Sequence, residues 1–369
     1  MTGFTIAPEP LHRWVVELFL AAGSDAREAG LAADHLVEAN LTGHDSHGVG
    51  MVPRYVLSLL ADELKLCRQP AILQDSGTML SVDGQRGLGQ SIAHAAMELA
   101  IDRAHAHGVC VMGLKDSHHI GRVGHWAEQA AAAGLVSIHF TNVNAATALV
   151  APWGGSQARF LTNPFTVGIP RADAPPVVLD FATSAIAGGK VRVAHNKGVP
   201  VPPGALIDAE GRPTQDPGVM FTADPAARGA QLPFAEHKGY ALAMVCELLG
   251  AALTGGETMR PENRNMRYAV WNNMLALVFD PARLGNGSYF EQEARAFVDW
   301  VRSARLSEAG QAQGGILMPG DPERRARQAR AQAIPIDAET MTQLDEAAAS
   351  IAARFGRGPG ALSPQARAA

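Results

Sequence analysis

Residues 43–50 read GHDSHGVG, which places two histidines, an aspartate and a serine among three glycines. Histidine is the side chain whose charge changes near neutral pH, and on a loop it can transfer protons or bind a metal ion. Two further stretches, SHHIGR at 117–122 and AEHKGY at 235–240, also place histidines close to glycine. We therefore take His47, His119 and His237 as the candidate functional histidines and interpret isolated ones, such as His35 and His195, as structural.

Two kinds of chemistry could use these histidines. Neutral imidazoles could bind a divalent metal together with Asp45 or Asp180, or one imidazolium could give a proton to a substrate oxygen. His44 and His47 are three residues apart and could chelate only if the turn between them were helical, which the following glycines argue against. The residues therefore favour acid–base chemistry, and no metal ligand is assigned.

The hydrophobic pattern predicts an α/β fold. GVCVMGL at 108–114 is typical of a buried strand and leads into the polar loop KDSHHIG; 124–134 favours a helix and 135–143 a second strand. A third strand should end at Asp180, with Thr183 or Ser184 capping the next helix. Ligands gather beyond the carboxyl ends of strands in such sheets, where His118, His119 and Asp180 are expected.

Helices should surround this core. About the first 60 residues are expected to be helical, with a capping box from Asp25 to Glu28, and GHDSHGVG should follow the exit of that helix. A long apolar helix is predicted over 238–256 and a Pro- and Gly-rich surface excursion over 199–218. The chain beyond residue 322 is again helical in pattern.

Composition narrows the classes of function. The 369 residues carry a net charge of −5, with 47% hydrophobic and 18% charged residues, so no basic field exists for nucleic acid or an anionic membrane. No apolar run is long enough for a membrane helix, and no signal peptide is recognisable at the N-terminus. Three dispersed cysteines without a CxxC spacing favour a reducing compartment, so we expect a cytoplasmic protein.

The common nucleotide and hydrolase fingerprints are missing. GVGMVP is the nearest approach to a GxGxxG loop, but it follows a predicted helix instead of a strand. The sequence contains no P-loop, HExxH or GxSxG motif. Spacing alone therefore supports no nucleotide site.

Six stretches taken together resemble the type-2 malate/L-lactate dehydrogenase family, which is distinct from the Rossmann-fold lactate and malate dehydrogenases. The resemblance runs in order from about residue 5 to about residue 350. The stretches are LTGHDSHGVGMVPRYV, SHHIGRVGHWAEQAAAAG, TNPF, LDFATSAIAGGKVRVAHNKGVPVPPG, FAEHKGYALA and LMPGDPE.

The resemblance implies a family-specific, non-Rossmann nicotinamide-binding domain with a mixed sheet, here residues 75–304. A mostly helical second domain would be formed by both chain ends, residues 1–74 and 305–369. It also implies a homodimer whose active sites lie between the domains, and it implies NAD as the cofactor, with NADP possible.

The resemblance further implies roles for individual residues. His47 would give a proton to the substrate carbonyl, Ser46 and Asp180 would orient it, and His119 would be the second catalytic group. Glycines of the loop would let the backbone approach the ligand, and helix N-termini near Gly121 and Thr183 would offer N–H groups to the pyrophosphate. The implied cofactor contacts are His47, Gly121, Arg122, Val123, Val178, Leu179, Asp180, Phe181, Ala182, His237, Lys238, Asn272, Met318, Pro319, Gly320 and Asp321.

One position departs from the family pattern. Many relatives carry SHGxxR, whose arginine is suited to bind a substrate carboxylate through two hydrogen bonds, whereas this chain has Met51 there. A branch of hydroxycarboxylate dehydrogenases shares the methionine. We expect Arg122, or else Arg54, to bind the carboxylate, and Met51 to provide an apolar wall that suits a bulky or aromatic substrate tail.

The sequence therefore predicts an oxidoreductase that reversibly reduces a 2-oxo acid to the L-2-hydroxy acid with NAD(P)H. Within the family the alternatives are reduction of a cyclic imine acid and oxidation of ureidoglycolate or sulfolactate. From another class, the alternative is a metal-dependent hydrolase built on the histidines.

Overall fold

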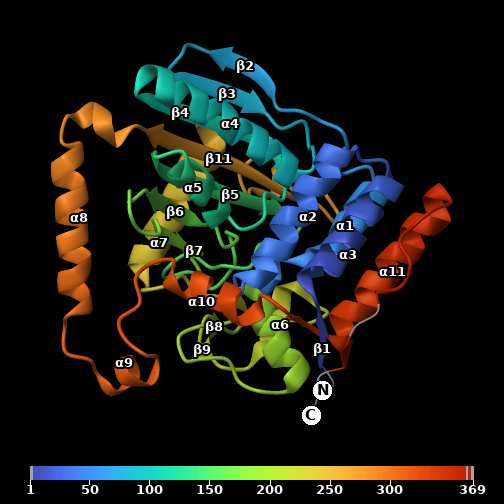
Figure 1. The fold of residues 1–369 in the computed structure, drawn as a ribbon. Coiled ribbons are helices and arrows are strands. Elements are labelled where there is room, and N and C mark those ends of the chain that lie inside the picture. Colours follow the sequence, from blue (N-terminus) through green and yellow to red (C-terminus); the bar gives the residue numbers. More distant parts are fainter. Residues whose placement is uncertain (1–2, 363–364, 367–369) are drawn as a thin grey trace.

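A seven-stranded mixed sheet forms the centre of the computed structural model, which describes residues 3–362 and 365–366 (Figure 1). Its strand order is β2-β3-β4-β11-β5-β6-β7; β3 and β4 are parallel, and every other neighbouring pair is antiparallel. The α/β class with a mixed sheet is thus confirmed. The strands are β2 (Ala71–Asp75), β3 (Met79–Asp83), β4 (Val109–His118), β5 (Val136–Ala145), β6 (Phe165–Ile169), β7 (Val177–Phe181) and β11 (Val270–Phe279).

The expected strand–helix–strand unit is present, with one addition and one correction. β4, α5 (Gly124–Ala132) and β5 follow one another, but β11 is inserted between the two strands and is antiparallel to both. The predicted polar loop KDSHHIG is wrong in its first half, because β4 continues to His118. Ser117 and His118 pair with Asn272 and Trp271 of β11, so these polar residues gain ladder hydrogen bonds.

Helices cover both faces of this sheet. α4 (Gly89–His107) and α5 share one apolar core with the side chains of Met274 and Ala276. Neighbouring residues of a strand point to opposite faces of the sheet, so Asn273 of β11 points away from α4 and α5. It faces Gly256, which follows the helix that covers the opposite face. That helix begins as α7 (His237–Val245) and becomes π-helical over Cys246–Ala252. The helix predicted over 238–256 is therefore α-helical only in its first part.

A second layer contains elements from both chain ends. Side chains from residues 6–64 and 334–351 form one apolar core, in which Trp14, Leu36 and Leu344 are buried. Asp25 caps the second helix by accepting the Glu28 N–H, as predicted. The other half of the predicted capping box does not form, because the Glu28 carboxylate accepts from the Ser24 hydroxyl and the Cys67 N–H. The domain boundaries at 74 and 305 remain a prediction. The elements are β1 (Gly3–Ile6), α1 (Pro8–Ala22), α2 (Ala26–Leu41), α3 (Val52–Leu60), α10 (Asp321–Arg330), β12 (Ile334–Asp337), α11 (Ala338–Phe355) and β13 (Gln365–Ala366).

The segment after β7 contains the expected excursion, but it is more ordered than its composition indicated. Short strands β8 (Leu206–Ile207), β9 (Pro213–Thr214) and β10 (Ala230–Gln231) form a small sheet in the order β10-β8-β9. The predicted cap at Thr183 or Ser184 is wrong, because α6 begins only at Gly188 (Gly188–Lys197). The hydroxyls of Thr183 and Ser184 instead donate to the carbonyls of Thr162 and Ile186.

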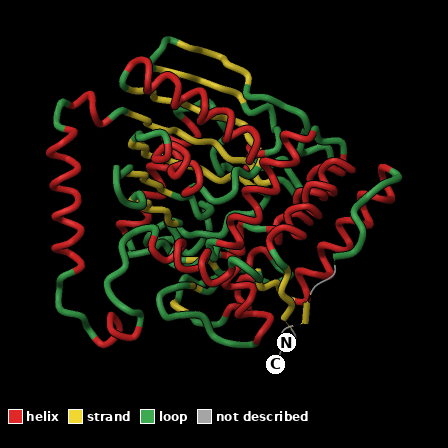
Figure 2. The backbone as a smooth tube through the Cα atoms, viewed as in Figure 1, coloured by secondary structure: helices red, strands yellow, loops and turns green. Residues whose placement is uncertain are grey.

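One helix stands apart from the rest. α8 (Gly287–Arg302) lies at the side of the molecule and is connected to the body through α9 (Glu308–Ala312) (Figures 1 and 2). Its only buried residue is Val298, whereas Tyr289, Phe297 and Trp300 are 65%, 57% and 70% exposed. Among the described residues, no helix is both long and apolar enough to cross a bilayer.

Candidate active site

The GHDSHGVG loop follows the end of α2 and forms two tight turns before α3. Asp45–His47 is a 3-10 turn, so the expectation that the glycines would prevent a helical turn there is wrong. Asn40 holds the next turn by accepting the Val49 N–H at 2.8 Å. A Cβ on Gly48 would lie 2.2 Å from that Asn40 oxygen, so this glycine makes room for a protein side chain and not for a ligand.

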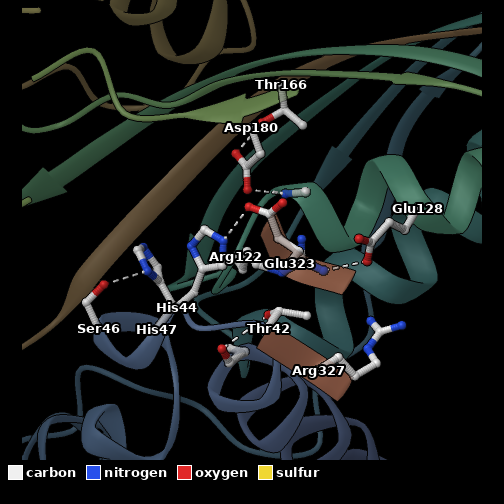
Figure 3. Close-up of polar contacts among 12 residues, drawn as sticks. Thr42, His44, Ser46, His47, Arg122, Glu128, Thr166, Asp180, Glu323 and Arg327 are labelled. Carbon is white, nitrogen blue, oxygen red and sulfur yellow. Dashed lines mark hydrogen bonds and ion pairs between the residues drawn. The ribbon is translucent and has the colours of Figure 1, made fainter. Parts of the chain in front are cut away.

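The C-terminal helix α10 fixes the loop from the other side. His44 Nε2 lies 3.1 Å from a carboxylate oxygen of Glu323 (Figure 3). Arg330 binds Asp45 at 2.7 Å. The first contact occupies Nε2 of His44. Two segments from opposite ends of the sequence therefore position the loop together.

His47 lies at the centre of the predicted catalytic group. Its Nδ1 is 3.0 Å from the Ser46 hydroxyl, and its ring stacks on His119 with centroids 5.5 Å apart and planes 20° apart. Burial, and secondarily His44, lowers the pKa of His47 to about 4, although the charge of Asp180 raises it. The structure thus brings His47, Ser46 and His119 together, with a neutral imidazole on His47 at neutral pH.

Asp180 is near His47 but makes its hydrogen bonds elsewhere. Its two carboxylate oxygens accept the Thr166 hydroxyl and the Gly124 N–H, both at 2.8 Å (Figure 3). Asp180 therefore occupies the N-terminus of α5, where the sequence predicted N–H groups for a pyrophosphate. Its influence on His47 is electrostatic and acts without a direct hydrogen bond.

The two candidate arginines differ in how far a ligand can reach them. Arg122 is 2% exposed and forms an ion pair with Glu128, while its Nε and Nη1 are buried without a partner. Arg54 is half-buried and donates from Nε to the Tyr268 carbonyl at 2.7 Å. The terminal nitrogens of Arg54 have no hydrogen-bond partner among the described residues. Of the two, Arg54 is therefore the better placed to meet a substrate carboxylate.

Met51, the position that departs from the family pattern, is half-buried. It packs against the apolar core formed by the two chain ends. The Met51 side chain therefore contributes to the packing of this core.

Three of the predicted cofactor segments meet along the free edge of β7. The Val178 N–H donates to the Pro319 carbonyl at 3.2 Å, which brings the Met318–Asp321 turn to the strand. Further along, the Phe234 N–H donates to the Thr183 carbonyl at 3.0 Å. The same edge therefore carries the segment that leads into His237 and Lys238.

The entrance to α7 is conformationally strained. Ala235 and Glu236 have φ values of 43° and 59°, a region that residues with a side chain rarely adopt. Such strain concentrates at functional sites. It leaves His237 and Lys238 exposed at the first turn of α7.

Two other predicted cofactor contacts have protein partners. Asn272 accepts the Ile120 N–H at 2.9 Å and donates to the Asn142 carbonyl at 3.0 Å, so its amide holds the chain beside His119. Gly121 has φ 76°, and a Cβ there would lie 2.0 Å from His35 Nε2. Packing against His35, which also accepts the Arg122 N–H, therefore requires this glycine. Val123 is buried in the core beside α4.

Sequence reasoning missed the polar partners of His119. The Tyr55 hydroxyl lies 2.6 Å from His119 Nδ1, and Gln90 Nε2 donates to the same hydroxyl at 2.8 Å. Tyr55 was recognised only as part of a helix, and nothing in the sequence singled out Gln90. The polar Gln90 at the start of a helix of small apolar residues was the only available signal.

The metal-site alternative requires several ligating side chains around one point. Within 3–362 and 365–366, no group of three or more His, Cys, Asp or Glu side chains is arranged to hold a metal ion. The metal-dependent hydrolase therefore has no ligand set in that part of the chain.

Comparison with known proteins identifies the family. The sequence model for malate/L-lactate dehydrogenase matches residues 6–345. Hydroxycarboxylate dehydrogenase B of Escherichia coli K12 is 45% identical over 352 residues, or 95% of each chain. An L-lactate dehydrogenase of Cupriavidus necator is 43% identical over 270 residues, covering 73% of this chain and 76% of its own. The solved sulfolactate dehydrogenase of Methanocaldococcus jannaschii superposes with a TM-score of 0.83 at 28% identity, covering 96% of this chain and 98% of its own. With its mixed sheet, its paired histidines and these likenesses, the chain belongs to the malate/L-lactate dehydrogenase family.

Proposed function

We propose that this protein reversibly reduces a 2-oxo acid to the L-2-hydroxy acid with a reduced nicotinamide cofactor. The observation that carries the proposal is the stacked pair of His47 and His119, with Asp180 close enough to act on the charge of His47. Two imidazoles of this kind can protonate and polarise one carbonyl oxygen.

The residues along the β7 edge suit a dinucleotide. Lys238 and His237 offer cationic or polar groups, and the strained turn before them keeps them exposed. The adjoining Val178–Ala182 and Met318–Asp321 segments would complete the binding surface. When bound, a reduced nicotinamide supplies a hydride to the carbonyl carbon.

His47 would then deliver the proton. Nδ1 is held by Ser46, so Nε2, which has no partner among the described residues, is the atom that exchanges a proton with the substrate oxygen. The low pKa of His47 means that the ring releases its proton readily. A bound substrate carboxylate would favour the imidazolium by its charge, so protonation and substrate binding support each other.

Arg54 would bind the substrate carboxylate. Burial, and secondarily the nearby Arg192, lowers the pKa of Arg54, so an anion between the two cations relieves their repulsion. Arg122 would act from beneath the site, as a buried positive charge near Asp180.

Relatives leave the finer specificity open. One relative, 35% identical, is named a Δ1-pyrroline-2-carboxylate/Δ1-piperideine-2-carboxylate reductase, and another, 32% identical, is named a sulfolactate dehydrogenase that uses NADP(+). We propose a 2-oxo acid as substrate and NAD as the preferred cofactor. We also propose the cytoplasm as its location, because the three cysteines of the structure are free thiols.

The test is an oxidation screen. Oxidation of NADH and of NADPH is followed with small, dicarboxylic and aromatic 2-oxo acids and with a cyclic imine acid. The substrates are compared by kcat/KM. Turnover of 2-oxo acids above the cyclic imine is expected. Turnover of the imine alone, or of none, would reject the proposed substrate class.

We also propose that the protein is a homodimer in which a second copy covers α8. The helix exposes Tyr289, Phe297 and Trp300 on an arm with little support from its own chain. Aromatic side chains grouped in this way mark protein interfaces. Phe297→Glu with Trp300→Glu should shift the mass in solution from dimer to monomer, whereas Gln292→Glu on the same helix should not. A monomeric wild-type protein would refute this.

A further inference from the structure

His119 is held by a short chain of hydrogen bonds from three separate elements. Tyr55 comes from α3, Gln90 from the first turn of α4, and His119 directly follows β4. Tyr55 is fully buried, Gln90 is 1% exposed and His119 is 8% exposed. Their contacts are therefore shielded from competition by water.

A glycine permits this approach of α4 to the site. Gly89 begins α4, and a Cβ there would lie 2.1 Å from the carbonyl oxygen of His119. Any other residue would push the helix away from His119. The backbone at Gly89 therefore sets Gln90 at the distance that its contact with Tyr55 requires.

With Nε2 of the Gln90 amide facing Tyr55, the donors and acceptors of this chain take a single direction. Gln90 Nε2 can only donate, so the Tyr55 oxygen accepts that hydrogen bond at 2.8 Å. The phenol has one proton, and its other partner is His119 Nδ1 at 2.6 Å. Tyr55 must therefore donate to Nδ1, which has to be unprotonated.

The other ring nitrogen of His119 is Nε2, which has no hydrogen-bond partner among the described residues. It is also not one of the fully buried polar atoms that lack a partner in that part of the chain. Burial, followed by the charge on His47, lowers the pKa of His119 well below its usual value, which keeps the ring neutral. Burial also raises the pKa of Tyr55 above its usual value, so the phenol retains its proton.

We propose that Tyr55 and Gln90 are positioning residues that hold neutral His119 as the Nε2–H tautomer. Nε2 then donates a hydrogen bond to the oxygen of the reacting carbonyl, and Nδ1 is unavailable for proton transfer. The two histidines thereby divide the work: His47 moves the proton, and His119 polarises the carbonyl. That the acceptor of this hydrogen bond is a substrate carbonyl oxygen rests on the proposed function. The Nε2–H tautomer of His119 does not rest on it.

The orientation of the Gln90 amide decides the direction of the whole chain. Its Oε1 has no partner among the described residues. If an oxygen instead of a nitrogen faced Tyr55, the phenol proton would go to residue 90 and Nδ1 of His119 would carry the proton. Gln90→Glu makes this change with almost no change in shape, because an ionised carboxylate only accepts.

The test is a nitrogen spectrum of the imidazoles in the full-length protein. Protein labelled with ¹⁵N-histidine is recorded without substrate, and the signals of His119 are identified by their loss in His119→Gln. The wild type should show an unprotonated Nδ1 and a protonated Nε2 on His119. Gln90→Glu at alkaline pH should reverse this pattern. A protonated Nδ1 in the wild type, or an unchanged pattern in Gln90→Glu, would overturn the proposal.

Kinetics give a second readout. Tyr55→Phe removes the donor and should lower kcat by about tenfold with little change in KM, as expected for one buried hydrogen bond that supports a catalytic group. Thr342→Val removes an exposed hydroxyl of α11, which donates to the Ala338 carbonyl outside this chain of hydrogen bonds, and should keep wild-type kcat. If Tyr55→Phe does not fold, the wild-type and Gln90→Glu spectra still decide. A wild type that shows the expected tautomer but reduces no 2-oxo acid would reject the function and leave the tautomer assignment standing.

Discussion

The rings of His47 and His119 stack with centroids 5.5 Å apart and planes within 20° of parallel, although one follows a helix near the N-terminus and the other follows a strand of the central sheet. The pair joins the helical layer to the sheet. Each ring has its Nδ1 bound to a neighbouring hydroxyl, Ser46 for His47 and Tyr55 for His119. Both Nε2 atoms therefore remain for chemistry.

Loss of His47 should remove most of the activity. His47→Ala should lower kcat for 2-oxo acid reduction by about 10²–10⁴-fold, the usual contribution of a general acid. Nicotinamide binding, measured by quenching of protein fluorescence, should weaken only modestly. Near-normal turnover in this variant would exclude His47 from proton transfer.

The pH dependence of the two directions should have opposite signs. With a pKa of about 4, His47 in the free enzyme gains its proton only as the pH falls. kcat/KM for reduction should therefore rise from neutral pH toward about pH 4, and kcat/KM for oxidation of the hydroxy acid should fall. Parallel profiles in the two directions would contradict a shared acid and base at His47.

Buried neutral histidines should make the fold sensitive to acid. Burial lowers the pKa of His118 to about 3 and of His139 to about 4, from the ordinary 6.5. Below pH 6.5 the histidines of the unfolded chain bind protons, whereas the buried ones of the folded chain do not. Their contribution to the free energy of unfolding is therefore fully present above pH 6.5 and is lost progressively toward pH 4.

The measurement is the urea midpoint across that range. Each such ring makes the free energy of unfolding fall by up to about 1.4 kcal/mol for each pH unit of acidification. His139→Gln should reduce the slope, and His105→Gln, at an exposed position on α4, should not. An identical slope in both variants would show that His139 is protonated in the folded state.

The two arginines should respond differently to substitution. Arg54→Met should raise KM for every 2-oxo acid by about one to two orders of magnitude, since charge-assisted hydrogen bonds are worth about 1.5–3 kcal/mol. Arg122→Met should mainly lower the melting temperature and kcat, because it leaves Glu128 and Asp180 without their buried cation. If only Arg122→Met raises KM uniformly, Arg122 is the carboxylate ligand and Arg54 is not.

Met51 tests whether this position tunes the substrate tail. Met51→Arg should penalise aromatic 2-oxo acids by desolvation and spare dicarboxylic ones. kcat/KM on pyruvate, 2-oxoglutarate and phenylpyruvate measures the ranking. Because Met51 packs against the helical core, the melting temperature of the Met51→Arg protein must be compared with that of the wild type. A well-folded variant with an unchanged ranking would limit Met51 to packing.

Local patterns were sufficient for much of the fold. β-rich apolar runs and a helix closed by glycine predicted the β4–α5–β5 unit, and the Asp25 cap was recognisable because capping depends on residues three apart. The same local rules failed where long-range partners decide. β11 pairs with the end of β4 and so extends a strand that looked like a loop, and α6 begins later than its polar residues suggested.

The sequence by itself determined which residues are candidates for the chemistry, because histidine, serine and aspartate on Gly-rich loops are informative without coordinates. Their partners depended on tertiary structure. Asp180 binds Thr166 and the start of α5, Arg122 pairs with Glu128 below the surface, and α10 holds the His44–Asp45 turn from the other end of the chain. Only the folded chain sets the direction of hydrogen bonds at His119, because Tyr55 and Gln90 are brought to it by two helices whose positions no local pattern encodes. Hydrogen bonding and burial act over a few ångströms in space, and distance along the chain does not predict which groups come within that range.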